Sequence, residues 1–225
     1  MEKLDYLIWR AGPLEVQVTA LLGPVAAALL AGSGVRGLTV STADTDAQVP
    51  RPMLLMGRGG ELAALVEVWL DSVDDRGQVE QALALAGGVA QGYLVTESVP
   101  QREPHPAPVG QRSPGLTHLT WFPKPDRLTD EQFFHGWHDV HTPASFALHP
   151  RRDGYVRDAV VRVLTPGAPA VRAIVSEHFP EVADYTEPAR LFGDEAALAQ
   201  TMAELPLYGD QAEMSSRPLW RTVLR

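Results

Sequence analysis

The distribution of hydrophobic and polar residues repeats between the two halves of the chain. Three pairs of segments correspond in the same order: the first and third pairs alternate like β-strands, and the second has a helical pattern. They are LDYLIW at 4–9 and LTHLTW at 116–121, LLGPVAAAL at 21–29 and VHTPASFAL at 140–148, and AALVEVWLDSVDD at 63–75 and RAIVSEHFPEVAD at 172–184. We infer that the chain contains two copies of one structural unit.

Each copy reads strand, helix, strand, strand, helix, strand, and the last strands lie near YLVTESV at 93–99 and LWRTVL at 219–224. This order is the ferredoxin-like βαββαβ pattern, in which helices cover only one face of the sheet. Two copies can bury their remaining apolar faces against each other. The sequence therefore predicts an α+β fold in which two ferredoxin-like repeats form a barrel within one chain, with a lumen between the sheets.

A proline-rich segment separates the two copies. SVPQREPHPAPVGQRSPG at 98–115 contains five prolines and no apolar periodicity, which is typical of a stiff, solvated connector. We therefore divide the chain into a first repeat at 1–100, a linker at 101–115 and a second repeat at 116–225.

The first helix of the second repeat has recognisable start and stop signals. Thr129 and Gln132 have the spacing of a capping box. Pro143 lacks a backbone donor and biases Thr142 away from the helical region. We therefore expect this helix to end close to His141.

Composition and charge narrow the class of protein. The formal net charge is −9, with Lys+Arg 19 against Asp+Glu 28, which disfavours a nucleic-acid partner. The absence of cysteine excludes disulfides and thiolate nucleophiles. The N-terminus does not resemble a secretory signal, and the apolar window at 18–32 is shorter than the roughly 20 helical residues that cross a bilayer, so it predicts a buried helix. We expect a cytoplasmic protein without a membrane partner and leave homodimer formation open.

All seven histidines lie at position 105 or later. Imidazole has an unperturbed pKa of about 6.5 and can act as acid and base near neutrality. We expect His118, His141 and His178 to line one half of the barrel, with His141 as the general acid/base and the other two polarising a carbonyl or phenolate. In the repeat alignment these histidines stand opposite Tyr6, Leu22 and Trp69 of the first copy.

The histidines do not predict a metal site. His135, His138 and His141 are three residues apart, which fans them around the helix, whereas a helical zinc motif uses i, i+4 spacing with a Glu between. We expect His135 and His138 to be surface or packing residues, and we expect neither a metal nor a cofactor.

The run LTDEQFFHGWHDVHTPASFAL, followed by GYVRDAV, resembles the EthD family, whose helix carries a Trp-x-x-x-His-x-Pro signature. Trp137, His141 and Pro143 match that signature, and Leu22 takes the place of the histidine in the first repeat. The resemblance implies a dimeric α+β barrel with its ligand in the lumen. That superfamily includes cofactor-free monooxygenases, muconolactone isomerases, polyketide cyclases or decarboxylases, and haem enzymes, so it does not define a reaction.

These observations favour a cofactor-independent lyase, isomerase or cyclase that acts on a small aromatic or polyketide-like molecule. Two alternatives stay open: a binding or accessory protein for a hydrophobic ligand, and a haem or metal oxidoreductase. We expect five further side chains to contact the substrate, namely Tyr6, Trp69, Trp137, Tyr155 and Glu177.

Overall fold

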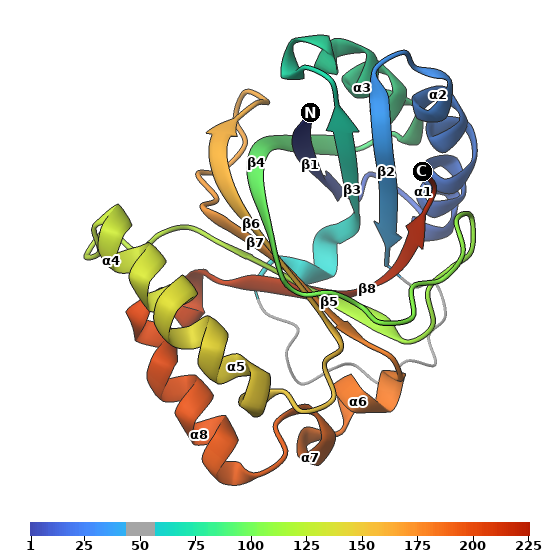
Figure 1. Ribbon diagram of the computed structural model, residues 1–225. Coiled ribbons are helices and arrows are strands. Elements are labelled where there is room, and N and C mark those ends of the chain that lie inside the picture. Colours follow the sequence, from blue (N-terminus) through green and yellow to red (C-terminus); the bar gives the residue numbers. More distant parts are fainter. Residues whose placement is uncertain (44–56) are drawn as a thin grey trace.

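The computed structural model describes residues 1–43 and 57–225, and its eight strands form a closed antiparallel barrel in the order β1-β3-β2-β8-β5-β7-β6-β4 (Figure 1). The strands are β1 (Glu2–Trp9), β2 (Val35–Thr42), β3 (Leu62–Leu70), β4 (Val89–Gln101), β5 (Leu116–Phe122), β6 (Gly154–Val163), β7 (Ala173–Phe179) and β8 (Ser215–Val223).

Helices lie outside the barrel. The α-helices are α1 (Leu14–Ala20), α2 (Ala26–Ala31), α3 (Arg76–Leu83), α4 (Asp130–Phe134), α5 (Thr142–Leu148), α6 (Val182–Thr186), α7 (Pro188–Leu191) and α8 (Glu195–Glu204). Two π-helical segments, η1 (Leu21–Val25) and η5 (His135–His141), join α1 to α2 and α4 to α5. The short 3-10 helices are η2 (Gly59–Glu61), η3 (Val73–Asp75), η4 (Ala84–Ala86), η6 (Leu205–Leu207) and η7 (Gln211–Glu213).

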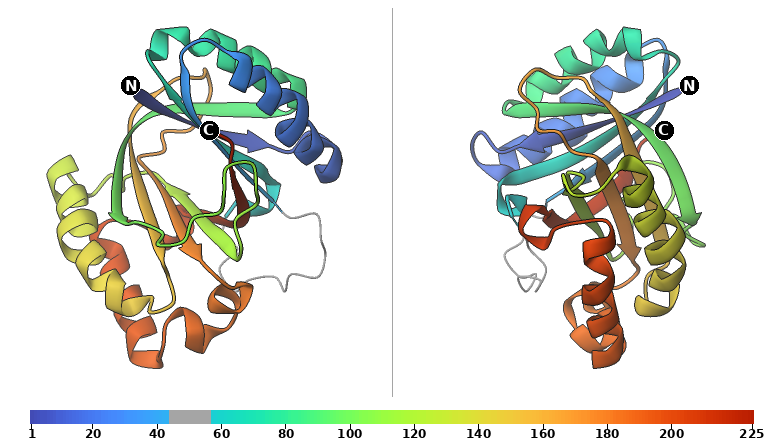
Figure 2. Two further views of the ribbon diagram at one scale, coloured as in Figure 1. Left: turned by 45° about the vertical axis from the view of Figure 1, so that its right-hand side comes forward. Right: turned by 90° about the vertical axis from the view of Figure 1, so that its left-hand side faces the viewer.

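The predicted pair of ferredoxin-like repeats is confirmed. The first repeat supplies a sheet in the order β4-β1-β3-β2, and the second supplies the equivalent order β8-β5-β7-β6. The two sheets join where β2 pairs with β8 and β4 pairs with β6, so each open edge is covered by the other repeat. The helices of the two repeats lie at opposite ends of the molecule (Figure 2).

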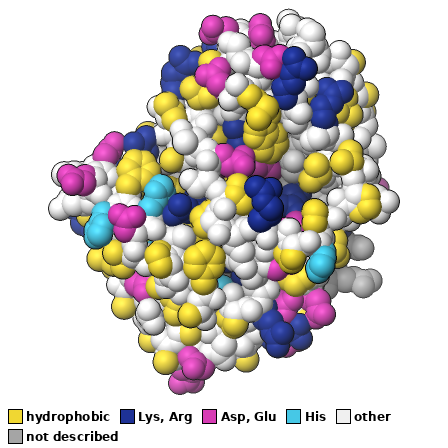
Figure 3. All heavy atoms as spheres, viewed as in Figure 1, with side chains coloured by type: hydrophobic (Ala, Val, Ile, Leu, Met, Phe, Trp, Pro, Cys, Tyr) yellow, Lys and Arg dark blue, Asp and Glu magenta, His cyan; other side chains and the backbone are white. Residues whose placement is uncertain are grey.

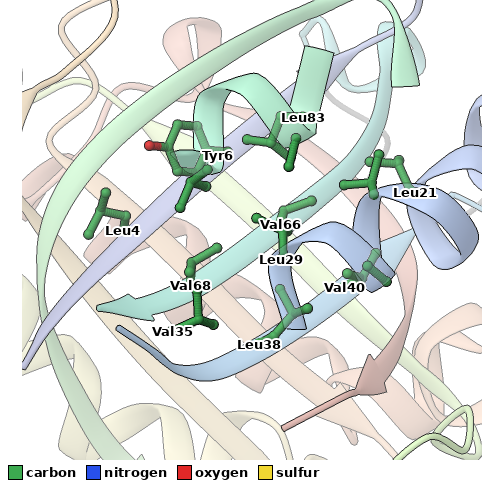
Figure 4. Close-up of a cluster of buried hydrophobic side chains, with 14 of the residues drawn as sticks. Leu4, Tyr6, Leu21, Leu29, Val35, Leu38, Val40, Val66, Val68 and Leu83 are labelled. Atoms are coloured by element: carbon green, nitrogen blue, oxygen red, sulfur yellow. The ribbon is translucent and has the colours of Figure 1, made fainter. Parts of the chain in front are cut away.

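The first repeat packs its helices onto its own sheet. Leu21, Val25 and Leu29 are buried against strand residues that include Tyr6 and Val66 (Figure 4). The continuous helix Leu14–Ala31 is long and apolar enough to cross a membrane by length and composition, but 28% of that span is buried in the fold. The prediction of a buried helix is therefore wrong in part, because only one helical face packs on the sheet.

The equivalent helix of the second repeat does not end at His141, as its sequence predicts, but continues to Leu148. The π-helical segment η5 lets it pass Pro143, because the Thr142 N–H donates to the Trp137 carbonyl five residues earlier. The Thr142 hydroxyl donates to the same carbonyl at 2.8 Å. Pro24 lies inside the π-helical segment of the first repeat. In both repeats, therefore, a π-helical segment lets the helix continue past a proline. The predicted capping box of Thr129 and Gln132 is confirmed.

The lumen is not one open chamber. Trp9 and Trp121 meet edge to face at 5.9 Å, and neighbouring apolar side chains fill that end of the barrel. Lys3 and several carboxylates occupy the other end. The linker after β4 runs beside β8, where the N–H of Ser113 donates to the Arg221 carbonyl at 2.7 Å.

Candidate active site

A cavity of about 140 Å³ lies between the second-repeat sheet and the helical segments η5, α7 and α8. Its polar wall includes His118 and Glu177 from the strands and His141 from the helix. Most of the remaining wall is apolar or aromatic, including Phe122, Trp137, Tyr155, Met202, Tyr208 and Met214. The cavity is therefore an apolar chamber with a small set of titratable groups.

Strand register decides which histidines share this cavity. His118 pairs with Glu177 across β5 and β7, whereas the next pair is Thr117 with His178. Side chains of paired residues lie on the same face of a sheet, and neighbours along a strand lie on opposite faces. His118 therefore faces the helices, and His178 faces the barrel lumen. The prediction that His118, His141 and His178 line one lumen is wrong.

One ring nitrogen of His141 is hydrogen-bonded to a carboxylate, and the other has no hydrogen-bond partner among the described residues. Its Nδ1 lies 3.0 Å from Oε2 of Glu204, and the other carboxylate oxygen, Oε1, accepts a hydrogen bond from the Gln200 amide at 2.8 Å. Within residues 1–43 and 57–225, Nε2 has no hydrogen-bond partner. Burial lowers the pKa of His141, although the hydrogen bond to Glu204 opposes that effect. The imidazole is thus held neutral near pH 7, with Nε2 able to accept a proton.

His118 belongs to a separate charged group beneath the same cavity. Its Nδ1 lies 3.6 Å from Glu177, an ion-pair distance, and its Nε2 lies 3.4 Å from the Thr120 hydroxyl. The Arg152 guanidinium donates to Glu177 at 2.6 Å. Burial by itself raises the pKa of Glu177, but His118 and Arg152 outweigh it and hold that pKa well below its usual range. Glu177 is therefore a fixed anion beside His118.

Aromatic side chains complete the chamber. The ring of Tyr208 lies 4.7 Å from that of His141, and the Arg152 guanidinium lies 4.2 Å from the centre of the Tyr155 ring. Burial raises the pKa values of Tyr155 and Tyr208, so both phenols stay protonated at neutral pH. Trp137 packs against Phe122 with ring centres 6.0 Å apart. These rings form flat apolar walls that suit an aromatic ligand.

The other predicted site residues lie elsewhere. Tyr6 is fully buried in the core between the first sheet and its helices, where the absence of a side chain at Gly92 makes room for its ring (Figure 4). Trp69 and His178 line a second cavity inside the lumen. Both ring nitrogens of His178 are occupied, by Asp153 at 2.6 Å and by the Pro114 carbonyl at 3.0 Å. His178 therefore ties the linker to the barrel.

Sequence reasoning missed several residues of the cavity. Tyr208 lines the cavity, and Glu204, which does not line it, contacts His141. Both lie more than 60 residues beyond His141, in segments without a recognisable motif. His149 is followed in the sequence by Pro150 and two arginines, which are typical of a loop, yet it is buried and lines the cavity. Leu191 and Phe192 also line it.

Several histidines and a glutamate line this cavity, but among the described residues they are not spaced to hold a metal ion. Among the residues that the structure describes, one group has the spacing to hold a metal ion, and it consists of Asp5, Glu67 and Asp158 in the lumen. His135 is exposed on the outer face of the helix, and neither it nor His138 lines the cavity, as expected.

No protein-family model and no curated protein matches the chain, so the resemblance to the EthD family stays a prediction. Two solved structures are similar across nearly the whole chain. An anthrone oxidase-like protein superposes with a TM-score of 0.62 at 12% identity, covering 99% of this chain and 93% of its own. A protein provisionally described as a monooxygenase, from Fusobacterium nucleatum, has a TM-score of 0.56 at 10% identity, with coverages of 100% and 92%. At these identities the likeness shows that the chain has the same eight-stranded α+β barrel fold.

Proposed function

We propose that this chain is an enzyme that removes a proton from a small hydroxylated or keto aromatic molecule and passes the resulting carbanion to dioxygen. The setting of His141 carries the proposal: Glu204 holds Nδ1, and Nε2 is unpaired at the wall of an apolar cavity. An imidazole oriented in this way is a general base, and such a base typically contributes roughly 10² to 10⁴ in rate.

Cavity size indicates the part of the substrate that is enclosed. Its volume of about 140 Å³ is close to that of an engineered apolar cavity, about 150 Å³, that binds benzene. One aromatic ring therefore fits between Trp137, Phe122 and Tyr208, and any further fused rings extend beyond the enclosed space. Glu177 is a largely buried anion in the same wall, which disfavours a carboxylate on the enclosed ring and favours a phenol, whose hydroxyl can donate to it.

The proposed reaction balances without a cofactor. Nε2 of His141 takes a proton from a ring methylene flanked by aromatic carbons, and the carbanion adds to dioxygen to form a peroxide anion. This anion takes the proton back from the His141 imidazolium to give a hydroperoxide. Loss of water then leaves a carbonyl, so that one oxygen atom stays in the product and the other leaves as water. The names of the two similar structures, anthrone oxidase-like protein and monooxygenase, support oxidation over the lyase, isomerase or cyclase reaction that the sequence favours.

The test is turnover of anthrone and of hydroxylated anthrones, which carry such a methylene, followed by oxygen uptake and by mass spectrometry of products formed under ¹⁸O₂. We expect label in the product, and we expect His141→Ala to lower kcat by about 10² or more. His135→Ala is the matched control, because His135 lies on the same helix but is exposed. Full activity in His141→Ala contradicts the assignment. Product without oxygen uptake indicates an isomerase or lyase, and saturable binding without product indicates a binding protein.

A further inference from the structure

His149 lies in the wall of the cavity that holds His141, and the proposed oxidation gives it no role. It directly follows α5 and is 9% exposed. Its Nδ1 lies 3.2 Å from the Leu191 carbonyl of α7, and its ring packs against Phe192 with ring centres 5.5 Å apart. Contacts with α7 and its neighbour therefore fix this imidazole at the opposite end of α5 from His141.

The Leu191 carbonyl determines which ring nitrogen of His149 carries the proton. A carbonyl oxygen can only accept a hydrogen bond, so Nδ1 is the donor. Burial lowers the pKa of His149, which keeps the ring neutral at pH 7. Nε2 is then unprotonated, and among the described residues it has no hydrogen-bond partner. His149 thus offers a lone pair to a ligand that brings a hydrogen-bond donor.

The separation of the two histidines along the helix indicates where that donor must lie. His141 and His149 are eight residues apart and flank α5, which corresponds to about 12 Å at 1.5 Å per residue. Both side chains line one cavity, so a substrate that reaches both Nε2 atoms spans a comparable distance. About 3 Å of this separates the base from the reacting carbon, and about 3 Å is the hydrogen bond. About 6 Å remain, which one aromatic ring fills when the reacting carbon and the donor are attached at opposite edges.

Glu177 is another hydrogen-bond acceptor in this wall, but both of its oxygens have partners. Oε1 accepts a hydrogen bond from Arg152 at 2.6 Å, and Oε2 lies 3.6 Å from Nδ1 of His118. Nε2 of His149 has no such competitor, which makes it the stronger candidate to receive a hydroxyl of the substrate.

The cavity reaches the surface beside α8. Leu198 and Met202 of this helix line the cavity, yet they are 37% and 43% exposed. On the face shown in Figure 3, hydrophobic side chains lie among polar ones over the helices of the second repeat. Fused rings outside the enclosed space can therefore lie against an apolar part of the surface.

We propose that His149 is a specificity-determining residue, whose Nε2 accepts a hydrogen bond from a substrate hydroxyl para to the ring carbon that bears the reacting methylene. The inference rests on the proposed function for the identity of that methylene. His141 and His149 then contact opposite edges of one ring, and the remaining fused rings leave the cavity along α8.

The test is calorimetric titration of the full chain with substituted anthrones in the absence of dioxygen, so that binding is measured separately from oxidation. In 2-hydroxyanthrone the hydroxyl is para to the ring carbon that bears the methylene, whereas in 4-hydroxyanthrone it lies beside the methylene. In 2-fluoroanthrone the hydrogen-bond donor is absent. We expect 2-hydroxyanthrone to bind about tenfold more tightly than either of the other two.

Two substitutions of His149 separate the roles of its ring nitrogens. His149→Asn keeps a donor near the position of Nδ1 and removes the Nε2 acceptor, so we expect the preference for 2-hydroxyanthrone to disappear. His149→Gln places an amide oxygen near the position of Nε2 and should retain part of the preference. His135→Asn is the matched control, because His135 is exposed on the same helix, and it should bind as the unchanged protein does. Thermal unfolding of each variant establishes that it is folded.

Equal affinity for the three anthrones in the unchanged protein, or no saturable heat with any of them, would overturn the proposal. A preference that persists in folded His149→Asn but is lost in Glu177→Gln would also overturn it, because the acceptor would then be Glu177. Oxidation of anthrone without any preference for 2-hydroxyanthrone contradicts this inference alone. The expected preference without oxygen uptake supports the role of His149 and contradicts the proposed oxidation.

Discussion

Replacement of Arg152 by methionine should destabilise the second repeat strongly. The side chain is fully buried, and its guanidinium donates to Glu177 at 2.6 Å, to Ser145 at 3.0 Å and to Gln101 at 3.2 Å. Methionine keeps much of the apolar stem but leaves the Glu177 carboxylate, which is only 14% exposed, without its main partner. Breaking a buried ion pair from one side costs about 3–5 kcal/mol, a large part of the roughly 5–15 kcal/mol that stabilises a typical domain.

Urea unfolding followed by tryptophan fluorescence measures the loss in free energy of unfolding caused by Arg152→Met. The pKa of Glu177 is lowered in the folded protein, so its contribution to the free energy of unfolding is present above its unfolded pKa and is lost as pH falls through the folded value. Without Arg152 this contribution is reduced. The difference in free energy of unfolding between the Arg152→Met variant and the unchanged protein should therefore shrink as pH falls below about 4.5.

Two controls test the reasoning. Arg36→Met removes an exposed pair with Asp71 and should cost no more than about 1 kcal/mol. The double variant Arg152→Met, Glu177→Gln removes both charges and should recover part of the loss. A cost below about 1 kcal/mol for Arg152→Met alone, or no recovery in the double variant, would refute the view that an uncompensated carboxylate causes the loss.

Two further changes test the site and the fold. Glu204→Gln removes the charge that supports protonation of His141, so the pKa of His141 should fall further and the acid limb of the kcat/KM profile should move to lower pH. We also expect kcat to fall by at least about tenfold. An unmoved acid limb would show that Glu204 does not act on His141. Gly92→Ala places a methyl group 2.5 Å from the Tyr6 ring, so chemical denaturation should show a loss of about 1–3 kcal/mol, whereas an unchanged midpoint would mean that the ring moves freely.

The sequence by itself was enough to predict the architecture. Alternation in LDYLIW and LTHLTW, with the same order of elements in both halves, identified β1 and β5 as equivalent strands. These patterns are local, and a sheet covered on one face only must bury the other, so the closed barrel follows from them. The same alignment paired Pro24 with Pro143, and the structure places both prolines near the end of a π-helical segment, where the helix returns to α-helical geometry.

The site required the tertiary structure. A shift of one residue along a strand moves a side chain to the opposite face, so His118 and His178 could not be placed without the pairing of β5 with β7. The partner of His141 is Glu204, 63 residues away, and the partner of Glu177 is Arg152, 25 residues away. Local periodicity carries no information about such pairs. The sequence alone therefore determined which elements form and that their faces must be buried, whereas strand register and helix packing decided which titratable groups share a cavity.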